Sequence, residues 1–124
     1  FFTPNETEAE FYLNKKIETE KDIKIASEEF LKKGIKNVVI TLGEKGCYFA
    51  NNKENFFMNA FKFKEPVLDT TAAGDAFNGA LAVGLSKDLD IKEVLTFANK
   101  VAAISTTKQG AAASMPSMED LKNY

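Results

Sequence analysis

The sequence predicts an α/β fold with a mainly parallel central sheet. A short run of β-branched and apolar residues at 37–42 is typical of a strand buried on both faces. A second stretch, at 76–85, is apolar nearly all round and predicts a central helix that is covered on several sides. Buried strands that alternate with helices indicate a layered α/β architecture. The length of 124 residues suits one domain or a part of one.

The first third of the chain is expected to hold two helices. Asn5 is a typical helix-capping residue, and Glu8 follows it in the capping-box pattern. A short helix is therefore expected at about 6–13. A second helix is expected at about 22–33, with apolar residues on one face and Gly34 as its C-terminal stop.

The middle of the chain is rich in short strand patterns. The parallel-type strand at 37–42 leads into a loop at 43–46. Cys47, the one cysteine, has apolar neighbours and is expected to be a small buried hydrophobe. Three further short strands are expected, at 47–50, 55–59 and 61–63.

The last part of the chain combines a small-residue turn, two helices and a loop. The turn at 69–75 leads into the apolar helix, and Asp90 is expected to cap the helix that follows. Asn99 is expected on the surface of that second helix, and a loop is expected at 108–114. The apolar face of the second helix is expected to consist of Ile91, Val94, Leu95, Ala98, Val101, Ala102 and Ser105.

The composition excludes several classes of binding and catalytic site. Apolar residues make up 44% and charged residues 27% of the chain, as in an ordinary globular protein. The formal net charge of −2, with both signs mixed along the chain, argues against nucleic-acid binding. The absence of histidine excludes Ser-His-Asp triads, Cys-His dyads and histidine zinc sites. A single cysteine excludes an internal disulfide and a cysteine zinc cluster.

The sequence also carries expectations about location. It contains no run of the roughly 18 apolar residues that a membrane-spanning helix needs, and its first residues do not form a signal-peptide pattern. We therefore expect a cytoplasmic protein without a membrane partner. The chain does not begin with Met, and Phe1 and Phe2 resemble the end of a strand, so we expect a piece that starts inside a fold.

The strongest chemical signal lies in the segment 69–75, DTTAAGD. Small residues and a glycine allow a sharp turn into a helix, whose free N–H groups bind anions. Asp75 falls in the first helical turn, where it can take a proton from an attacking hydroxyl, as phosphoryl transfer requires. An acid at this place is also an ordinary dipole-stabilising residue, and Gly74 alone indicates only a tight turn. From the residues alone, both interpretations stay open.

The segment 69–80, DTTAAGDAFNGA, resembles the C-terminal signature of the ribokinase (PfkB) family of carbohydrate kinases. PNETEAE at 4–10 resembles the family's N-x-x-E segment, and TLGEKG at 41–46 resembles its nucleotide-phosphate loop. The loop 107–114 resembles its monovalent-cation loop. The resemblance covers 1–116 and implies a three-layer ribokinase-like fold with a mainly parallel central sheet. The chain would be an incomplete, C-terminal part of that fold, with the ATP-binding and catalytic residues.

The resemblance implies ATP-dependent phosphorylation of D-ribose to ribose 5-phosphate. Asp75 would be the general base that deprotonates the sugar hydroxyl. The N–H groups of Ala73, Gly74 and Asp75 would form an anion hole for the transferring phosphoryl group. Asn5 and Glu8 would organise magnesium and its water molecules, and the capping box is the structural alternative for this pair.

The implied ATP site draws on several segments. Turn geometry is the alternative explanation for its loop glycines, and an ordinary place on a helix surface is the alternative for Asn99. The implied ATP contacts are Asn5, Thr41, Gly43, Glu44, Lys45, Gly46, Gly74, Asp75 and Asn99.

A potassium site is also implied. The bound ion would order the anion hole and make the electrostatic potential there more positive. Its implied ligands, several of them through backbone carbonyls, are Asp69, Thr71, Ser105, Lys108, Gly110 and Ser114.

Two alternatives to a ribose kinase stay open. One is a kinase of the same family for another sugar or a nucleoside, and the other is a non-catalytic nucleotide-binding module. The family's sugar pocket lies mainly in an N-terminal half that this chain lacks. We therefore expect the isolated chain to be inactive, and the resemblance allows the whole protein to be a homodimer.

Overall fold

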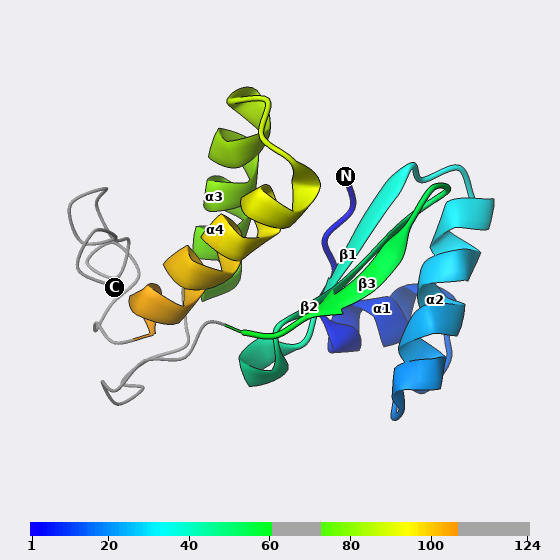
Figure 1. The fold of residues 1–124 in the computed structure, drawn as a ribbon. Coiled ribbons are helices and arrows are strands. Elements are labelled where there is room, and N and C mark those ends of the chain that lie inside the picture. The colour runs from blue at the N-terminus through cyan, green and yellow to red at the C-terminus, as the bar shows by residue number, and fades with distance from the viewer. Residues whose placement is uncertain (61–72, 107–124) are drawn as a thin grey trace. The chain divides into compact units, whose positions relative to one another are not determined.

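The computed structural model describes residues 1–60 and 73–106, which belong to two compact units (Figure 1). The first unit comprises Phe1–Asn59 and the second Ala60–Tyr124. The strand predicted at 61–63 and the loop predicted at 108–114 lie outside the described residues.

Two helices of the first unit, α1 (Glu6–Leu13) and α2 (Glu20–Lys32), each begin at a capping box. At α2, the Asp22 N–H donates to the Thr19 hydroxyl (3.2 Å), and the Thr19 N–H donates to the Asp22 carboxylate (3.1 Å). Because of this second box, α2 starts earlier than predicted. Backbone N–H groups of Glu18 and Thr19 donate to Asp22 and hold the pKa of that exposed carboxyl below its usual value.

Three short strands form an antiparallel sheet in the order β1 (Asn37–Thr41), β2 (Cys47–Asn51), β3 (Asn55–Met58). Val39 lies opposite Phe49, which in turn lies opposite Phe56. The strands alternate in direction because short loops join them. Their bounds agree closely with the strands predicted in this region.

The other edge of β1 carries the parallel pairing that the sequence predicted. Phe2 forms a parallel bridge with Val38, and Asn5 forms one with Thr41. The N–H of Val39 donates to the carbonyl of Phe2 (2.9 Å). Within the described residues, parallel pairing is limited to these bridges, so β1 is parallel to its neighbour on one edge and antiparallel on the other.

The core of the first unit lies between the sheet and its two helices, which cover one face in Figure 1. Alternate residues of β1, Val38 and Ile40, point into this core, as strand geometry requires. Cys47 is fully buried, as predicted. The buried members of the core are Ala9, Ile17, Ile23, Ala26, Phe30, Val38, Ile40, Leu42, Tyr48 and Ala50.

The described part of the second unit consists of two packed helices, α3 (Ala73–Ser86) and α4 (Ile91–Ser105). The carboxylate of Asp90 caps α4 by accepting from the Lys92 N–H (3.3 Å), as predicted. The helices approach closely at Gly84, where an added Cβ would lie 3.0 Å from a methyl group of Val94.

Two expectations about these helices were wrong. α3 was expected to be covered on several sides, but it is buried on one face only. On its other face, Val83 and Leu85 are 44% and 38% exposed. Asn99 is not on the helix surface, since it is only 7% exposed on α4. Ile91 and Ala102, predicted on the apolar face of α4, are half-buried, and Ile104 is buried in addition.

None of the helices in residues 1–60 and 73–106 is long and apolar enough to cross a membrane.

Candidate active site

A reciprocal pair of hydrogen bonds between Asn5 and Glu8 closes the N-terminus of α1. The Glu8 N–H donates to Asn5 Oδ1 (2.7 Å), and the Asn5 N–H donates to Glu8 Oε1 (2.9 Å). The predicted capping box is therefore confirmed, and both side chains are exposed. Glu8 Oε2 takes no part in this pair, so it is available to a ligand.

The start of α1 is tied to the C-terminal end of β1. The Thr41 N–H donates to the carbonyl of buried Pro4 (2.9 Å), next to the bridge between Asn5 and Thr41. This pairing brings two segments that the sequence separates, 4–10 and 41–46, to one place. No sequence pattern indicates that the Pro4 carbonyl holds them together, because that contact is made by backbone atoms.

The loop after β1 is a short 3₁₀ helix, Gly43–Lys45, that is closed by its own backbone. The Leu42 N–H donates to the Gly46 carbonyl (2.8 Å), and the Gly46 N–H donates to the Gly43 carbonyl (3.1 Å). The side chains of Glu44 and Lys45 are exposed beside it.

The two glycines of this loop differ in their surroundings. Gly46 is buried, with φ 103° and ψ −129°, a conformation essentially restricted to glycine. Gly43 is exposed with φ 60°, and an added Cβ would meet nothing within 4 Å. Turn geometry therefore explains Gly46 fully, whereas Gly43 also leaves open space for a ligand.

The first described turn of α3 carries the residues that are predicted to form an anion hole. The described part of the helix starts at Ala73. Free N–H groups in the first turn of a helix, together with the helix dipole, favour an anion at that end. Asp75 is exposed in the same turn.

Gly74 is not explained by the fold around it. It is exposed, and its φ is not among the positive values found at other glycines. An added Cβ would meet nothing within 4 Å among the described residues. A tight turn at Gly74 itself is therefore excluded, and the bare backbone leaves room for a group to approach the N–H donors.

The remaining predicted site residues are divided between α4 and the parts outside the described residues. Asn99 is buried on α4, and Ser105, 1% exposed, donates its hydroxyl to the Ala102 carbonyl (2.7 Å). Five implied potassium ligands lie outside the described residues, namely Asp69, Thr71, Lys108, Gly110 and Ser114.

The side-chain oxygen atoms of Asn5 and Glu8, at the start of α1, fit a magnesium ion that is held through water. Within residues 1–60 and 73–106, no three His, Cys, Asp or Glu side chains gather as a metal site. Magnesium keeps several of its waters and is usually bound through one or two carboxylates and substrate phosphates. Glu8 Oε2 alone is sufficient for such an indirect contact.

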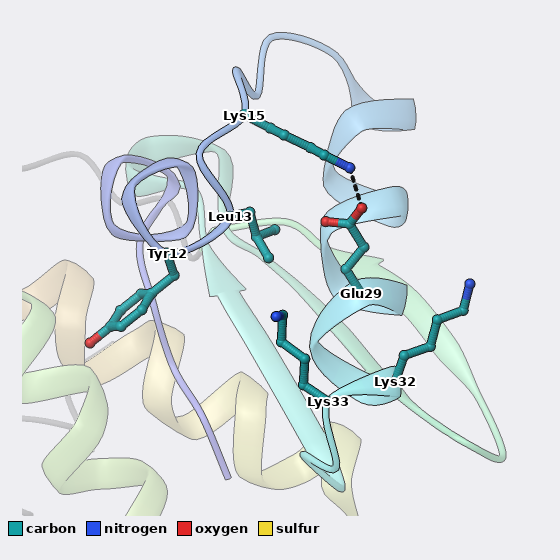
Figure 2. Close-up of a pocket in the computed structure, with 6 residues that line it drawn as sticks. All are labelled: Tyr12, Leu13, Lys15, Glu29, Lys32 and Lys33. Carbon is teal, nitrogen blue, oxygen red and sulfur yellow. Dashed lines mark hydrogen bonds and ion pairs between the residues drawn. The ribbon is translucent and has the colours of Figure 1, made fainter.

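A groove of about 430 Å³ between the ends of α1 and α2 contains none of the predicted site residues. Figure 2 shows Lys15 reaching across to form an ion pair with Glu29, while Lys33 points toward Leu13. Lys32 and Lys33 lie at the C-terminus of α2, where positive charge stabilises a helix. The charges of this groove therefore have a structural explanation.

Comparisons with known proteins agree with the resemblance. The model of the pfkB family carbohydrate kinases matches residues 1–118. The chain belongs to this family. It is 41% identical to the ribokinase of Staphylococcus aureus over 119 residues, which are 95% of this chain and 38% of that protein. It is 34% identical to the deoxyribokinase of Salmonella typhi, covering all of this chain and 40% of that protein.

The ribokinase-like fold is confirmed by similarity to solved structures of the family. The ribokinase of Arabidopsis thaliana, solved with ribose and ATP, matches with a TM-score of 0.92 and 31% identity. The match covers 98% of this chain and 39% of that one. This pfkB-family chain thus spans about two-fifths of the length of the relatives it matches.

Proposed function

We propose that the whole protein is a kinase that transfers the γ-phosphoryl group of ATP to D-ribose. The family supports phosphoryl transfer to a carbohydrate. The names of the relatives support ribose as the substrate and ATP as the donor, because the Arabidopsis protein was solved with both. The Salmonella relative supports 2-deoxyribose as the main alternative, within the broader alternative of another sugar or a nucleoside.

The observation that carries this proposal is the exposed pair Gly74 and Asp75 in the first turn of α3. The backbone at Gly74 is open, and the N–H groups there favour an anion. A carboxylate beside an anion site is electrostatically unfavourable, so its presence there indicates a function in the reaction. Accepting a proton from the attacking hydroxyl is such a function.

In the proposed reaction, the Asp75 carboxylate takes the proton of the sugar's primary hydroxyl. The sugar oxygen forms a bond to the γ-phosphorus, and the bond from that phosphorus to the β,γ-bridging oxygen breaks, so ADP leaves. The N–H groups of residues 73–75 stabilise the charge of the transferring phosphoryl group, which is the main catalytic requirement. The sequence predicted these roles, and they stay proposals.

The residues gathered at α1 and β1 are proposed to hold the ATP phosphates. Thr41, Gly43, Glu44, Lys45 and Gly46 form the wall on that side, and buried Asn99 on α4 is proposed to lie near the adenine. Glu8 Oε2 would accept a hydrogen bond from a magnesium-bound water, and Asn5 keeps Glu8 in place. Magnesium, when bound, would neutralise phosphate charge. Potassium is proposed beside the anion hole, with Ser105 on its α4 side.

The proposal is tested by measuring ADP release by the whole protein with magnesium and potassium present. D-ribose, 2-deoxy-D-ribose, D-fructose and adenosine serve as alternative acceptors, and ³¹P NMR identifies the product. We expect the highest kcat/KM for ribose and a phosphomonoester at its primary oxygen. A higher value for another acceptor changes the substrate but keeps the class. ATP binding without transfer to any acceptor would favour the non-catalytic nucleotide-binding module.

Three further statements stay predictions. The isolated chain is expected to show no ribose-dependent transfer, because lost positioning of the sugar removes roughly 7–11 kcal/mol of barrier lowering. A cytoplasmic location and the absence of nucleic-acid and membrane partners also stay predictions, which rest on the sequence alone. Gel filtration of the whole protein tests the proposed homodimer.

A further inference from the structure

We propose that Glu10 is a positioning residue, whose carboxylate ties α1 to the loop 14–19 and thereby keeps Glu8 in place at the start of the helix. This inference rests on the proposed function, in which Glu8 Oε2 contacts a magnesium-bound water. Glu10 belongs to the segment 4–10 that carries the family resemblance, but the proposed mechanism gives it no role.

α1 rests on the core of the first unit through few side chains. The helix has eight residues, and Ala9 is its one buried residue, while Leu13 is partly buried against the core. An isolated helix of this length is marginal in water, so its position depends on tertiary contacts. Because a side chain as small as that of Ala9 does not fix the rotation of a helix about its axis, other contacts have to hold both ends of α1. Exposed Glu8 moves with the helix and therefore depends on these contacts.

The N-terminal end of α1 is held by the backbone of β1, and the C-terminal end is held by Glu10. Glu10 Oε2 accepts from the N–H of Ile17 (2.8 Å) in a partly buried hydrogen bond. The Glu10 carbonyl accepts from the N–H groups of Asn14 and Lys15, the latter at 3.3 Å. From within α1, Glu10 thus binds three N–H groups of the loop that follows the helix.

The loop residue that the Glu10 carboxylate binds is itself fixed. Ile17 is 8% exposed and belongs to the core between the sheet and the two helices. The carboxylate therefore connects α1 to the core, and a hydrogen bond to a charged acceptor is stronger than one between neutral groups. The ion pair between Lys15 and Glu29 spans the same region, but 57% of the Lys15 side chain is exposed, and exposed ion pairs contribute little.

Asp22 provides a matched comparison for Glu10. Its carboxylate accepts from the N–H groups of Glu18 and Thr19 in the same loop, but it belongs to α2. Removing it should lower stability, as removing the Glu10 carboxylate does, without moving Glu8. A purely structural role of Glu10 predicts the same outcome for both carboxylates, whereas a positioning role predicts that only Glu10 affects magnesium.

Four substitutions test the proposal in the whole protein. Glu10→Ala removes the acceptor, Glu10→Asp keeps the charge on an arm that is one methylene shorter, and Glu10→Gln keeps the acceptor oxygen without the charge. Asp22→Ala is the control. The readouts are the magnesium concentration that gives half-maximal rate, amide hydrogen exchange in α1 of the metal-free protein, and the unfolding temperature.

We expect Glu10→Ala and Glu10→Asp to raise the required magnesium concentration about tenfold, as for other residues that orient a metal ligand. Hydrogen exchange in α1 should become faster in the same two variants. Glu10→Gln should stay close to wild type in both respects. Asp22→Ala should lower the unfolding temperature about as much as Glu10→Ala but should change neither the magnesium requirement nor exchange in α1.

Two results would overturn the proposal. One is a Glu10→Ala variant with a lower unfolding temperature and an unchanged magnesium requirement, which would make Glu10 purely structural. The other is a Glu10→Gln variant as impaired as Glu10→Ala beside a normal Glu10→Asp, which would make the charge of Glu10 important and its hydrogen bond to Ile17 irrelevant.

A double substitution separates this inference from the proposed function. If Glu10 acts through Glu8, Glu10→Ala should not lower the residual rate of Glu8→Gln at any magnesium concentration. An equal loss in both backgrounds would mean that Glu10 acts elsewhere. A normal magnesium response in Glu8→Gln alone would remove the proposed role of Glu8, and this inference with it, even where exchange in α1 depends on Glu10.

Discussion

Asn5 and Glu8 hold each other at the start of α1, with each backbone N–H donating to the other residue's side chain at 2.7 and 2.9 Å. The hydrogen bond from the Asn5 N–H uses Glu8 Oε1, and Glu8 Oε2 takes no part in the pair. The structural and the proposed metal-linked roles of this pair are therefore compatible, because they use different atoms. They can also be separated by substitution.

We expect Glu8→Gln to keep the fold and to lose magnesium-dependent activity. Glutamine completes a capping box as well as glutamate does, but it carries no charge for a magnesium-bound water. Asn5→Ala should lower the free energy of unfolding by about 1 kcal/mol. Thr19→Ala is the matched control, because it breaks the box of α2 without touching the site. Chemical denaturation and magnesium titrations of activity measure the two effects, and a normal magnesium response in Glu8→Gln would contradict the metal role.

Asp75→Asn should nearly abolish phosphoryl transfer while ATP still binds. Loss of a general base costs about 10²–10⁴ in rate. Stability should change little, since the side chain is exposed and the change is isosteric. The checks are steady-state turnover and calorimetric titration with ATP. More than half of the wild-type activity in this variant is incompatible with Asp75 as the base.

Substitutions of Gly74 should damage function and spare the fold. Gly74→Ala should leave the unfolding temperature unchanged or raise it. The residue is helical, its φ is not positive, and an added Cβ would meet nothing within 4 Å among the described residues. Gly74→Val should weaken both nucleotide binding and turnover, since its branched side chain obstructs the N–H donors. Thermal unfolding and nucleotide titration decide the question. Unchanged affinity and unchanged rate in Gly74→Val would leave the residue without a ligand role.

Gly84 should show the opposite behaviour. An added Cβ would lie 3.0 Å from one methyl group and 3.3 Å from the other methyl group of fully buried Val94. Gly84→Ala gains helix propensity, but overpacking costs typically 1–3 kcal/mol, so we expect net destabilisation of about 1 kcal/mol. Val94→Ala removes the methyl groups that the added Cβ would meet but leaves a cavity of its own. The double variant Gly84→Ala/Val94→Ala should therefore lose less stability than the sum of the two single losses. Strictly additive losses would show that the two positions do not interact.

Potassium should activate the whole protein, and sodium should do so poorly. A cage of carbonyl oxygens suits the larger ion, while sodium holds its water more tightly. The test compares kcat in potassium, sodium and tetramethylammonium chloride at equal ionic strength. Equal rates in the three salts would exclude the site. Ser105→Ala should weaken the response only slightly, because the substitution keeps the backbone carbonyl of residue 105, and several of the implied ligands are backbone carbonyls.

The sequence by itself determined most of the local structure. The capping patterns at Asn5 and Asp90 specified two helix starts, because an N-cap is a short-range interaction between a side chain and the next turn. The apolar, β-branched run at 37–42 and the short strand pattern at 47–50 marked β1 and its hairpin partner correctly. The segment 69–80, together with the segments 4–10, 41–46 and 107–114, was sufficient to identify the family, which the match over residues 1–118 confirms.

Only the tertiary structure decided which of these segments meet and which faces are covered. The parallel bridge from Asn5 to Thr41 joins two site segments through backbone atoms, which leave no trace in side-chain pattern. Asn99 is buried and Val83 is exposed, against the expectations for both, because burial depends on which neighbouring element covers a helix face. Gly46 and Gly74 look alike in a sequence, but the first is explained by its dihedral angles and the second by open space. Helix caps and short apolar strand runs act within a few residues and can be predicted, whereas contacts between distant segments depend on the whole packing.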